Sequence, residues 1–400
     1  MSQRDFDDLT DLNDLNIIAG GLLHDLALLQ PSERSRFGYT RAARVITSGI
    51  DRPVADLVDE GTLRDVPFVG PSSERVIVEL VRTGASESVE KAVAASTRRS
   101  EVEKRRRYRR AYLSRCAMRT ALDAAMPAAI VSTQTYRGDL QMHSTWSDGV
   151  ESVATLANAA LGLGWSRIGI TDHSYGLPIA RGMSMEAALR QHREIDKVNA
   201  DFGGRMRVYK GVEANILADG ALDLPPEEQS VFDYVLASPH SELRKEYDQT
   251  SRMLAAVKQP GVAILGHPQG RMYNTRPGIT ADWVRVFREA AKRGVAIEID
   301  GNWHRQDIDH ELAAVALDAG CLFALDSDAH SVAEFAFTDY AVAHARVARV
   351  PADRVVNCWE ASTFDDWLRE KRGKPPRISK RADARVSPRS RATRRAPSRG

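Results

Sequence analysis

The sequence has few cysteines and no long apolar run, and both absences narrow the class of protein. Only three of its 400 residues are cysteine (Cys116, Cys321 and Cys358), and none belongs to a Cys-x-x-Cys pair. This argues against a disulfide framework and against a thiolate zinc site. The apolar runs are too short to span a bilayer, and the acidic start "MSQRDFDDLTDLND" lacks the apolar segment of a signal peptide. We therefore predict a cytoplasmic protein with no membrane partner.

The chain also lacks a large excess of either charge, with 56 Lys/Arg against 54 Asp/Glu. The balance hides an asymmetry, because residues 369–400 hold thirteen Lys/Arg and two Asp/Glu, which leaves 43 basic and 52 acidic residues elsewhere. This segment has several prolines and almost no large apolar residues, a composition that predicts a disordered basic tail. Such a tail either neutralises the phosphates of a polyanion or serves only solubility, and the sequence leaves both open.

The N-terminal part predicts a small all-α domain over residues 1–95, followed by a basic helix and linker over 96–136. Helical apolar patterns run through 11–33 and 41–65. The stretch "DVPFVGPSSERVIVELVRTG" (65–84) is typical of a turn that leads into a helix. Backbone amides at such a helix start suit an anion.

From residue 138 onward, short β-rich segments alternate with helical ones. This alternation predicts an α/β barrel of parallel strands over 137–368, with the active site at the C-terminal ends of the strands. The seven expected strands are 138–143, 166–171, 207–213, 233–238, 262–267, 295–300 and 322–327.

Ionisable residues gather where these strands end. Five of the ten histidines and four carboxylates fall there: His143, Asp148, Asp172, His173, Glu213, His240, His267, Asp328 and His330. Neutral imidazole together with carboxylate is a ligand set for zinc, manganese or iron. The pattern therefore predicts a metal centre at the barrel mouth.

The motifs around these residues carry a family resemblance. "GDLxxHSxxSDG", "ITDHS", "GVE", "SPHS", "GHPxGR" and "SDAHS" follow one another over about 138–365, and this order resembles the PHP superfamily (polymerase and histidinol phosphatase). The resemblance implies a distorted (β/α)7 barrel that holds two or three divalent ions, manganese or zinc in first place and iron in second. The ligands that it implies are His143, Asp148, His173, Glu213, His240, His267, Asp328 and His330, with Glu213 as a bridge.

The N-terminal part resembles one branch of that superfamily, the bacterial family-X DNA polymerases. "NIIAGGLLHDLALL", "FGYTRAARVI" and "GTLRDVPFVGP" resemble their helical DNA-binding domain with its helix–hairpin–helix, which implies DNA as a partner. One departure is Phe68, which replaces the first hairpin glycine and weakens the expected phosphate contact. A second is that residues 84–137 contain no paired-Asp palm motif, so we do not predict nucleotide polymerisation.

Gln141 is the one mismatch among the motif residues. The first strand of the family usually ends His-x-His, and Gln141 takes the place of the first His, on the same strand face as His143. An amide oxygen coordinates a hard ion but binds zinc more weakly than imidazole does. We expect looser occupancy of one ion and a shift toward manganese, and whether Gln141 is itself a ligand stays open.

Together these observations predict a metal-dependent phosphoesterase that acts on DNA ends, as a 3′→5′ exonuclease or a 3′-phosphatase. Metal-activated water would attack phosphorus in line. The expected catalytic residues are His267, Arg271 and Asp328. Arg271 is included because its planar guanidinium can hold a phosphate oxygen. Arg305 and Arg181, on rim loops, are further candidates for substrate binding.

Two alternatives remain, and the sequence indicates no oligomeric state. One is a small-molecule phosphate monoesterase of the histidinol-phosphatase kind, which would need neither residues 1–130 nor the tail. The other is a DNA-binding module whose site is weakened by Gln141.

Overall fold

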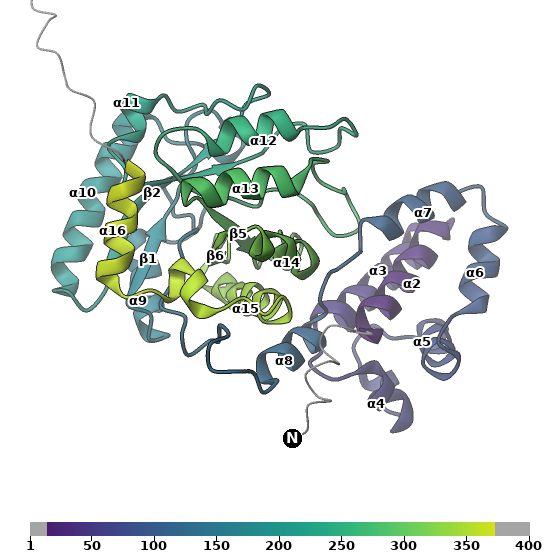
Figure 1. Ribbon diagram of the computed structural model, residues 1–400. Helices are drawn as coiled ribbons and strands as arrows, with labels where there is room; N and C mark the ends of the chain where they lie inside the picture. Colours follow the sequence, from purple (N-terminus) through teal and green to yellow (C-terminus); the bar gives the residue numbers. More distant parts are fainter. Residues whose placement is uncertain (1–13, 373–400) are drawn as a thin grey trace, which may run out of the picture.

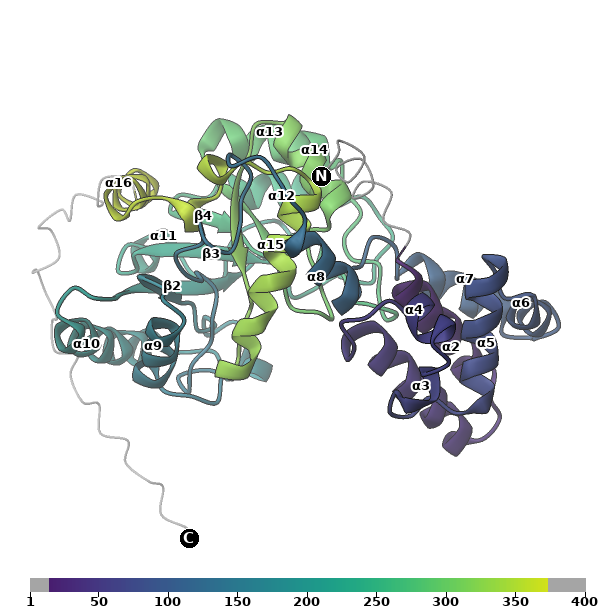
Figure 2. The same ribbon diagram turned by 90° about the horizontal axis from the view of Figure 1, so that it is seen from below.

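The computed structural model describes residues 14–372. Figures 1 and 2 show a helical unit at one side of a larger α/β unit, with the chain crossing between them near α8. The helices of the first unit and the crossing are α2 (Leu15–Leu29), α3 (Glu33–Ser48), α4 (Val54–Asp59), α5 (Pro71–Thr83), α6 (Glu87–Ala94), α7 (Arg99–Arg107) and α8 (Arg115–Asp123).

The second unit alternates strands and helices, and its α/β class is as predicted. Its strands are β1 (Arg167–Ile170), β2 (Arg207–Asn215), β3 (Tyr234–Ser238), β4 (Val262–Leu265), β5 (Ala296–Asp300) and β6 (Leu322–Asp326). Its helices are α9 (Val153–Gly162), α10 (Met185–Phe202), α11 (Pro226–Gln229), α12 (Thr250–Val257), α13 (Trp283–Arg293), α14 (His310–Asp318), α15 (Thr338–Val347) and α16 (Ala361–Arg372).

Helix α2 is the centre of the helical unit. It contacts α3, α4, α5, α6 and α7, and its residues Ala19 and Leu23 are fully buried in a core that also includes Ile46 and Ile77. A helix that is apolar on most sides is typically enclosed by others. Asp14 caps the start of the helix, and its side chain accepts a hydrogen bond from the backbone N–H of Ile17.

A buried ion cluster joins the end of α2 to the basic stretch after α6. Asp25 is 1% exposed, and its two carboxylate oxygens lie 2.7 Å from Arg106 Nε and 2.5 Å from Arg109 Nη2. Removing one partner of a buried ion pair leaves the other charge without compensation, which costs far more than losing an exposed pair. Two arginines of the basic stretch are therefore structural.

The six strands pair in parallel in the order β1-β2-β3-β4-β5-β6. Their side chains alternate between two cores. In β3, Tyr234 and Leu236 belong to an inner cluster that Phe364 of α16 closes at one end. Val235 and Ala237 belong to the outer cluster, which packs beneath the surrounding helices.

The expected first strand, 138–143, forms only an isolated parallel bridge, at Met142 with Ala329. Side chains accept from two of its backbone N–H groups in place of a neighbouring strand: Asp326 Oδ1 accepts from the Leu140 N–H at 2.8 Å, and Thr171 Oγ1 accepts from the Met142 N–H at 3.2 Å. The segment still lies between β1 and the end of β6, since the Gly169 N–H donates to the Asp139 oxygen. It thus fills the seventh position of the barrel without regular strand pairing.

The two units are joined by specific hydrogen bonds around residues 112–114. The Asp14 carboxylate accepts from the Ser114 N–H at 2.7 Å and from the Ser114 hydroxyl at 2.8 Å. Gln306, on the loop after β5, accepts from the Leu113 N–H at 2.8 Å and donates to the Leu113 oxygen at 3.0 Å. The connecting segment is therefore held by both units.

Helix α16 extends to Arg372, so the first residues of the predicted tail (369–400) are helical. Trp367 anchors this helix with a 2.9 Å hydrogen bond from its indole N–H to the Gly294 oxygen. The rest of that prediction, residues 373–400, lies outside the described residues. Within residues 14–372, no helix is both long enough and apolar enough to span a membrane.

We predict that Asp25→Ala lowers the free energy of unfolding of the helical unit by about 3 kcal/mol, because Arg106 and Arg109 lose their buried counter-charge. Chemical denaturation of the full chain measures this. The matched control is Asp59→Ala, whose ion pair with Arg82 is more than half exposed and should cost at most about 1 kcal/mol. Equal losses in the two variants would contradict the structural role of Asp25.

Candidate metal centre

The strand ends bring all eight implied ligands to one mouth of the barrel. Seven of them form three groups in which the potential ligand atoms all lie within 4.8 Å of one another. The groups are His143, Asp148, His173 and His330; His173, Glu213 and His240; and His143, Glu213 and Asp328. Because His143, His173 and Glu213 are shared, the groups form one continuous cluster.

Glu213, at the end of β2, lies at the centre of this cluster and is fully buried. Its Oε1 lies 2.9 Å from His267 Nε2 and 3.3 Å from His240 Nε2. Its Oε2 lies 3.0 Å from His173 Nδ1 and 3.4 Å from His143 Nε2. Burial alone would raise the pKa of Glu213, but the surrounding imidazoles hold it well below its usual range. The carboxylate is therefore ionised and can bridge two cations.

A second part of the cluster is built from stacked imidazoles around Asp148. The ring of His143 lies 4.4 Å from those of both His173 and His330, and all three are nearly parallel. Asp148 Oδ1 lies 3.4 Å from His330 Nε2 and 3.7 Å from His173 Nε2. Four donors thus converge on one point near the surface, where Asp148 remains 28% exposed.

Close backbone contacts position the segment that carries His143 and Asp148. A Cβ on Gly149 would lie 2.2 Å from the backbone oxygen of His143, and a Cβ on Gly138 would lie 1.7 Å from that of Arg167. Only glycine allows such approaches. The two glycines at the ends of "GDLQMHSTWSDG" thus let this segment fold tightly against β1 and against itself.

Asp172, which was not among the implied ligands, holds the same segment from beneath. It accepts hydrogen bonds from the backbone N–H groups of Ser144 at 2.8 Å and Ser147 at 3.0 Å, and from both serine hydroxyls. Gln191 of α10 donates to it at 2.5 Å. Asp172 therefore orients the loop that presents Asp148.

Two of the implied ligands have strained backbones. His267 has φ +21° and Asp328 has φ +52°, and both are almost fully buried. Residues other than glycine rarely adopt a positive φ, and such strain concentrates at functional sites. The backbone N–H of His267 donates to Glu298 Oε2 at 2.5 Å, which stabilises its turn.

The donor set fits divalent cations. Burial lowers the pKa of His173 to about 3 and that of His267 to about 4, so both rings are neutral and can coordinate through a lone pair. The Nδ1 atoms of His143, His240 and His267 are buried and have no hydrogen-bond partner within the described residues. Buried polar atoms are normally satisfied, so an ion or ordered water is the expected neighbour.

Gln141 is fully buried, and neither its amide oxygen nor its amide nitrogen has a hydrogen-bond partner within residues 14–372. Leaving a primary amide buried and unsatisfied costs free energy unless something else meets it. The backbone N–H of Gln141 donates to Asp139, so only the side chain is left without a partner. This is consistent with a place beside a bound ion.

The three predicted arginines occupy three different settings. Arg305 lies at the cluster, with Nη2 3.1 Å from Asp328 Oδ2 and its side chain 20% exposed. Arg271 is buried in the junction between the units, where it pairs with Asp309 and stacks 3.9 Å from the Tyr112 ring centroid. Arg181 is exposed on the loop after β1. Of the three arginines, the structure therefore brings only Arg305 to the implied ligands, because Asp309 and Tyr112 engage Arg271 elsewhere.

Three further carboxyls lie beneath the mouth and were missed by sequence reasoning. Glu298, Asp300 and Asp326 are fully buried at the ends of β5 and β6. Burial, reinforced by their mutual proximity and by Asp328, raises the pKa of Glu298 and of Asp300 well above the usual range. In the sequence, acidic residues inside the apolar runs "VAIEID" and "LFALDS" could have indicated these buried carboxyls.

Comparisons with known proteins give several matches. The chain is 37% identical over 197 residues to the DNA polymerase/3′-5′ exonuclease PolX of Bacillus subtilis, covering 49% of this chain and 34% of PolX. It is 30% identical over 178 residues to a probable phosphatase of Caldanaerobacter subterraneus, covering 42% of this chain and 67% of that protein. The chain thus spans about a third of PolX and two thirds of the phosphatase. No protein-family model matches.

Among solved structures, that of histidinol phosphate phosphatase from Lactococcus lactis, complexed with zinc, L-histidinol and phosphate, matches with a TM-score of 0.41 and 18% identity. The match covers 52% of this chain and 94% of that one.

A parallel barrel with histidines and carboxylates converging at the C-terminal ends of its strands defines a metal-dependent hydrolase. The proteins that it resembles in sequence identify the superfamily within this class. The chain belongs to the PHP superfamily.

We predict that Gln141→His tightens metal binding by about tenfold or more, because imidazole replaces a weaker amide donor beside His143. Competition with a chromophoric chelator, titrated with zinc and with manganese, measures this. Gln259→His, on the turn after α12, is the matched control and should leave the affinity unchanged. Equal affinities for Gln141→His and the parent protein would show that position 141 does not contact an ion.

Proposed function

We propose that this protein is a metal-dependent phosphoesterase that acts on DNA ends, as a 3′→5′ exonuclease or a 3′-phosphatase. The observation that carries the proposal is the continuous cluster of three ligand groups joined by Glu213, His143 and His173. Divalent ions held there supply Lewis acidity toward a phosphate group and a nucleophilic water near neutral pH. Manganese and zinc are the ions that we propose, since the donors are imidazoles and carboxylates.

The chain's own residues would orient the phosphoester. The His143 and Glu213 side chains hold their positions through burial, while Asp148 and His330 stay partly exposed at the entrance. Arg305 is paired with Asp328 and retains an exposed portion. A guanidinium there can neutralise charge on a non-bridging phosphate oxygen.

The DNA substrate is supported by the helical unit and by its attachment to the mouth. The loop after β5 carries both Gln306, which binds the connecting segment at Leu113, and Arg305, which contacts the metal ligand Asp328. Any DNA strand that the helical unit binds would thus lie near the mouth of the barrel. PolX, to which this chain is similar, is itself named a 3′-5′ exonuclease.

A small-molecule phosphate monoesterase is the second candidate. It is supported by the probable phosphatase, two thirds of which this chain covers. In that case the free phosphomonoester would be hydrolysed faster than any DNA end, and the helical unit would contribute nothing to the rate.

We predict that the manganese-loaded protein releases nucleotide or phosphate from 3′-labelled oligonucleotides and that Glu213→Gln reduces this rate at least about a hundredfold, because the bridging charge is lost. Resolving the products on a denaturing gel separates the two activities, since an exonuclease shortens the strand and a phosphatase does not. Chelation should abolish the activity, and added manganese should restore it.

The control variant is Glu227→Gln, which removes an exposed carboxylate on α11 that belongs to none of the three ligand groups. Its rate should equal that of the parent protein. No release from any 3′ end, together with hydrolysis of small phosphomonoesters, would instead establish the second candidate.

A further inference from the structure

One face of α3 carries cations and an aromatic ring that the metal site does not use. Phe37, Arg41, Arg44 and Ser48 are spaced i, i+4, i+7 and i+11, which places them along one side of the helix. Phe37 is 61% exposed, and both arginines are exposed. Neither arginine has an acidic partner within the described residues, and each instead contacts aromatic rings.

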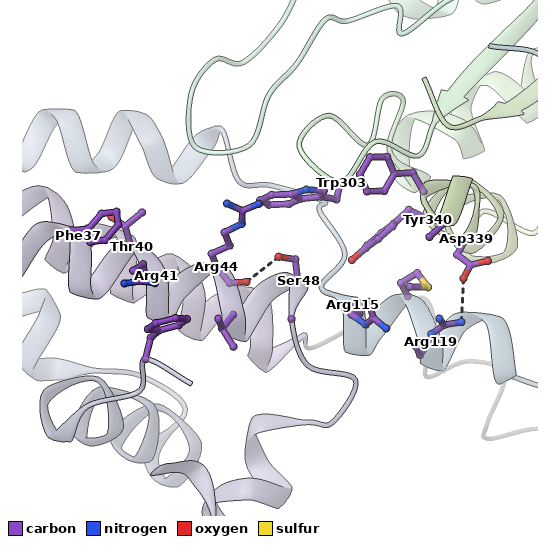
Figure 3. Close-up of a pocket in the computed structure, with 16 residues that line it drawn as sticks. Phe37, Thr40, Arg41, Arg44, Ser48, Arg115, Arg119, Trp303, Asp339 and Tyr340 are labelled. Carbon is purple, nitrogen blue, oxygen red and sulfur yellow. Dashed lines mark hydrogen bonds and ion pairs between the residues drawn. The ribbon is translucent and has the colours of Figure 1, made fainter. Parts of the chain in front are cut away.

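This face lines a cleft of about 640 Å³ between the helical unit and the barrel. Figure 3 shows Arg44 reaching from α3 to Trp303, with Tyr340 beyond it on the barrel side, while Phe37 and Arg41, which also line the cleft, lie farther along α3. Arg115 and Arg119 of α8 also line the cleft, but Asp51 and Asp339 pair with them. The free positive charge of the cleft therefore comes from α3.

Phe68, in the hairpin between α4 and α5, adds a second exposed ring to the cleft. Its side chain is 50% exposed, and its backbone has φ +68°, a left-handed conformation that suits glycine. The Arg41 guanidinium lies 3.9 Å from the Phe68 ring centroid and 5.0 Å from that of Phe37. Backbone strain of this kind is concentrated at functional sites.

Trp303 adds a third aromatic ring to the cleft, on the barrel side. The Arg44 guanidinium lies 5.5 Å from its ring centroid, so rings and guanidinium groups alternate along the cleft. Phe37 and Phe68 are exposed, and Trp303 is half-buried beside His304. Accessible rings interleaved with unpaired cations are the elements that bind unpaired nucleic-acid strands, in which bases stack and phosphates are neutralised. A duplex offers no free base faces for such stacking.

We propose that this cleft binds an unpaired nucleic-acid strand, with bases on Phe37, Phe68 and Trp303 and phosphates on Arg41 and Arg44. The inference rests on the proposed function, to which it adds the form of the substrate. Trp303 is only two residues, at most about 7 Å of chain, from Arg305, which contacts the metal ligand Asp328. The bound nucleic-acid strand would thus run from the helical unit toward the metal centre.

The test is the binding of a fluorescein-labelled oligothymidylate to the full-length chain, followed by anisotropy in the presence of a chelator so that no hydrolysis occurs. Phe68→Gly should raise the Kd about tenfold, because one stacking ring is lost. Its melting temperature should not fall, since glycine suits the backbone at this position. Arg44→Gln should raise the Kd and lower its salt dependence by nearly one phosphate contact.

Two matched controls use side chains outside the cleft. Tyr247→Ala removes a ring that is 54% exposed on the loop before α12, and Arg288→Gln removes an exposed charge on α13. Both should bind as the parent protein does. If Phe68→Gly binds no more weakly than Tyr247→Ala, the proposal is overturned.

Competition and cross-linking separate the possible ligands. Oligouridylate should compete with oligothymidylate, whereas a duplex competing equally well would overturn the proposal. An oligonucleotide that carries 5-iodouracil should cross-link to peptides containing Phe37, Phe68 or Trp303, and cross-links confined to other peptides would contradict it.

The result of the binding test does not depend on whether the protein hydrolyses DNA. Phe68-dependent binding without any cleavage would refute the proposed function and leave the cleft in place. Cleavage of DNA ends with unaltered binding by Phe68→Gly would refute the cleft alone.

Discussion

The buried carboxylate of Glu213 is the group on which the rest of the barrel mouth depends. It stands at the end of β2 with four imidazoles within 3.4 Å of its oxygens. An ionised carboxylate in so apolar a place is costly unless cations or donors surround it. The strand order brings His173, His240 and His267 to it from the ends of β1, β3 and β4, so the site depends on the parallel sheet.

Around this centre, each layer of residues supports the next. Asp172 orients the loop that presents Asp148, and Glu298 stabilises the strained turn at His267. Beneath them, burial and mutual proximity raise the pKa of Glu298 and of Asp300 well above the usual range, which lessens the repulsion among acids that share a small volume. The helical unit is joined to the same loops through Gln306 and Leu113.

Much of this could be predicted from the sequence, because ligand-bearing motifs at the ends of alternating strands must meet at one edge of a parallel sheet. The surroundings of Arg271 could not be predicted, since its partners Tyr112 and Asp309 are distant in sequence and belong to the junction between the units. Its catalytic role stays a prediction. The expected strand 138–143 is irregular, because side-chain acceptors that no periodicity reveals take the N–H groups of Leu140 and Met142. Phe68 was noticed as a replacement for glycine, but its exposure and its contact with Arg41 needed the fold.

The converging ligands predict a working metal centre at the mouth despite Gln141. The decisive measurement is the amount of zinc, manganese and iron in the purified full-length chain, after saturation and removal of excess metal. We expect two or three ions per chain, because three ligand groups share His143, His173 and Glu213. Less than one ion per chain would contradict it, and would leave a barrel that keeps its ligands but binds no metal.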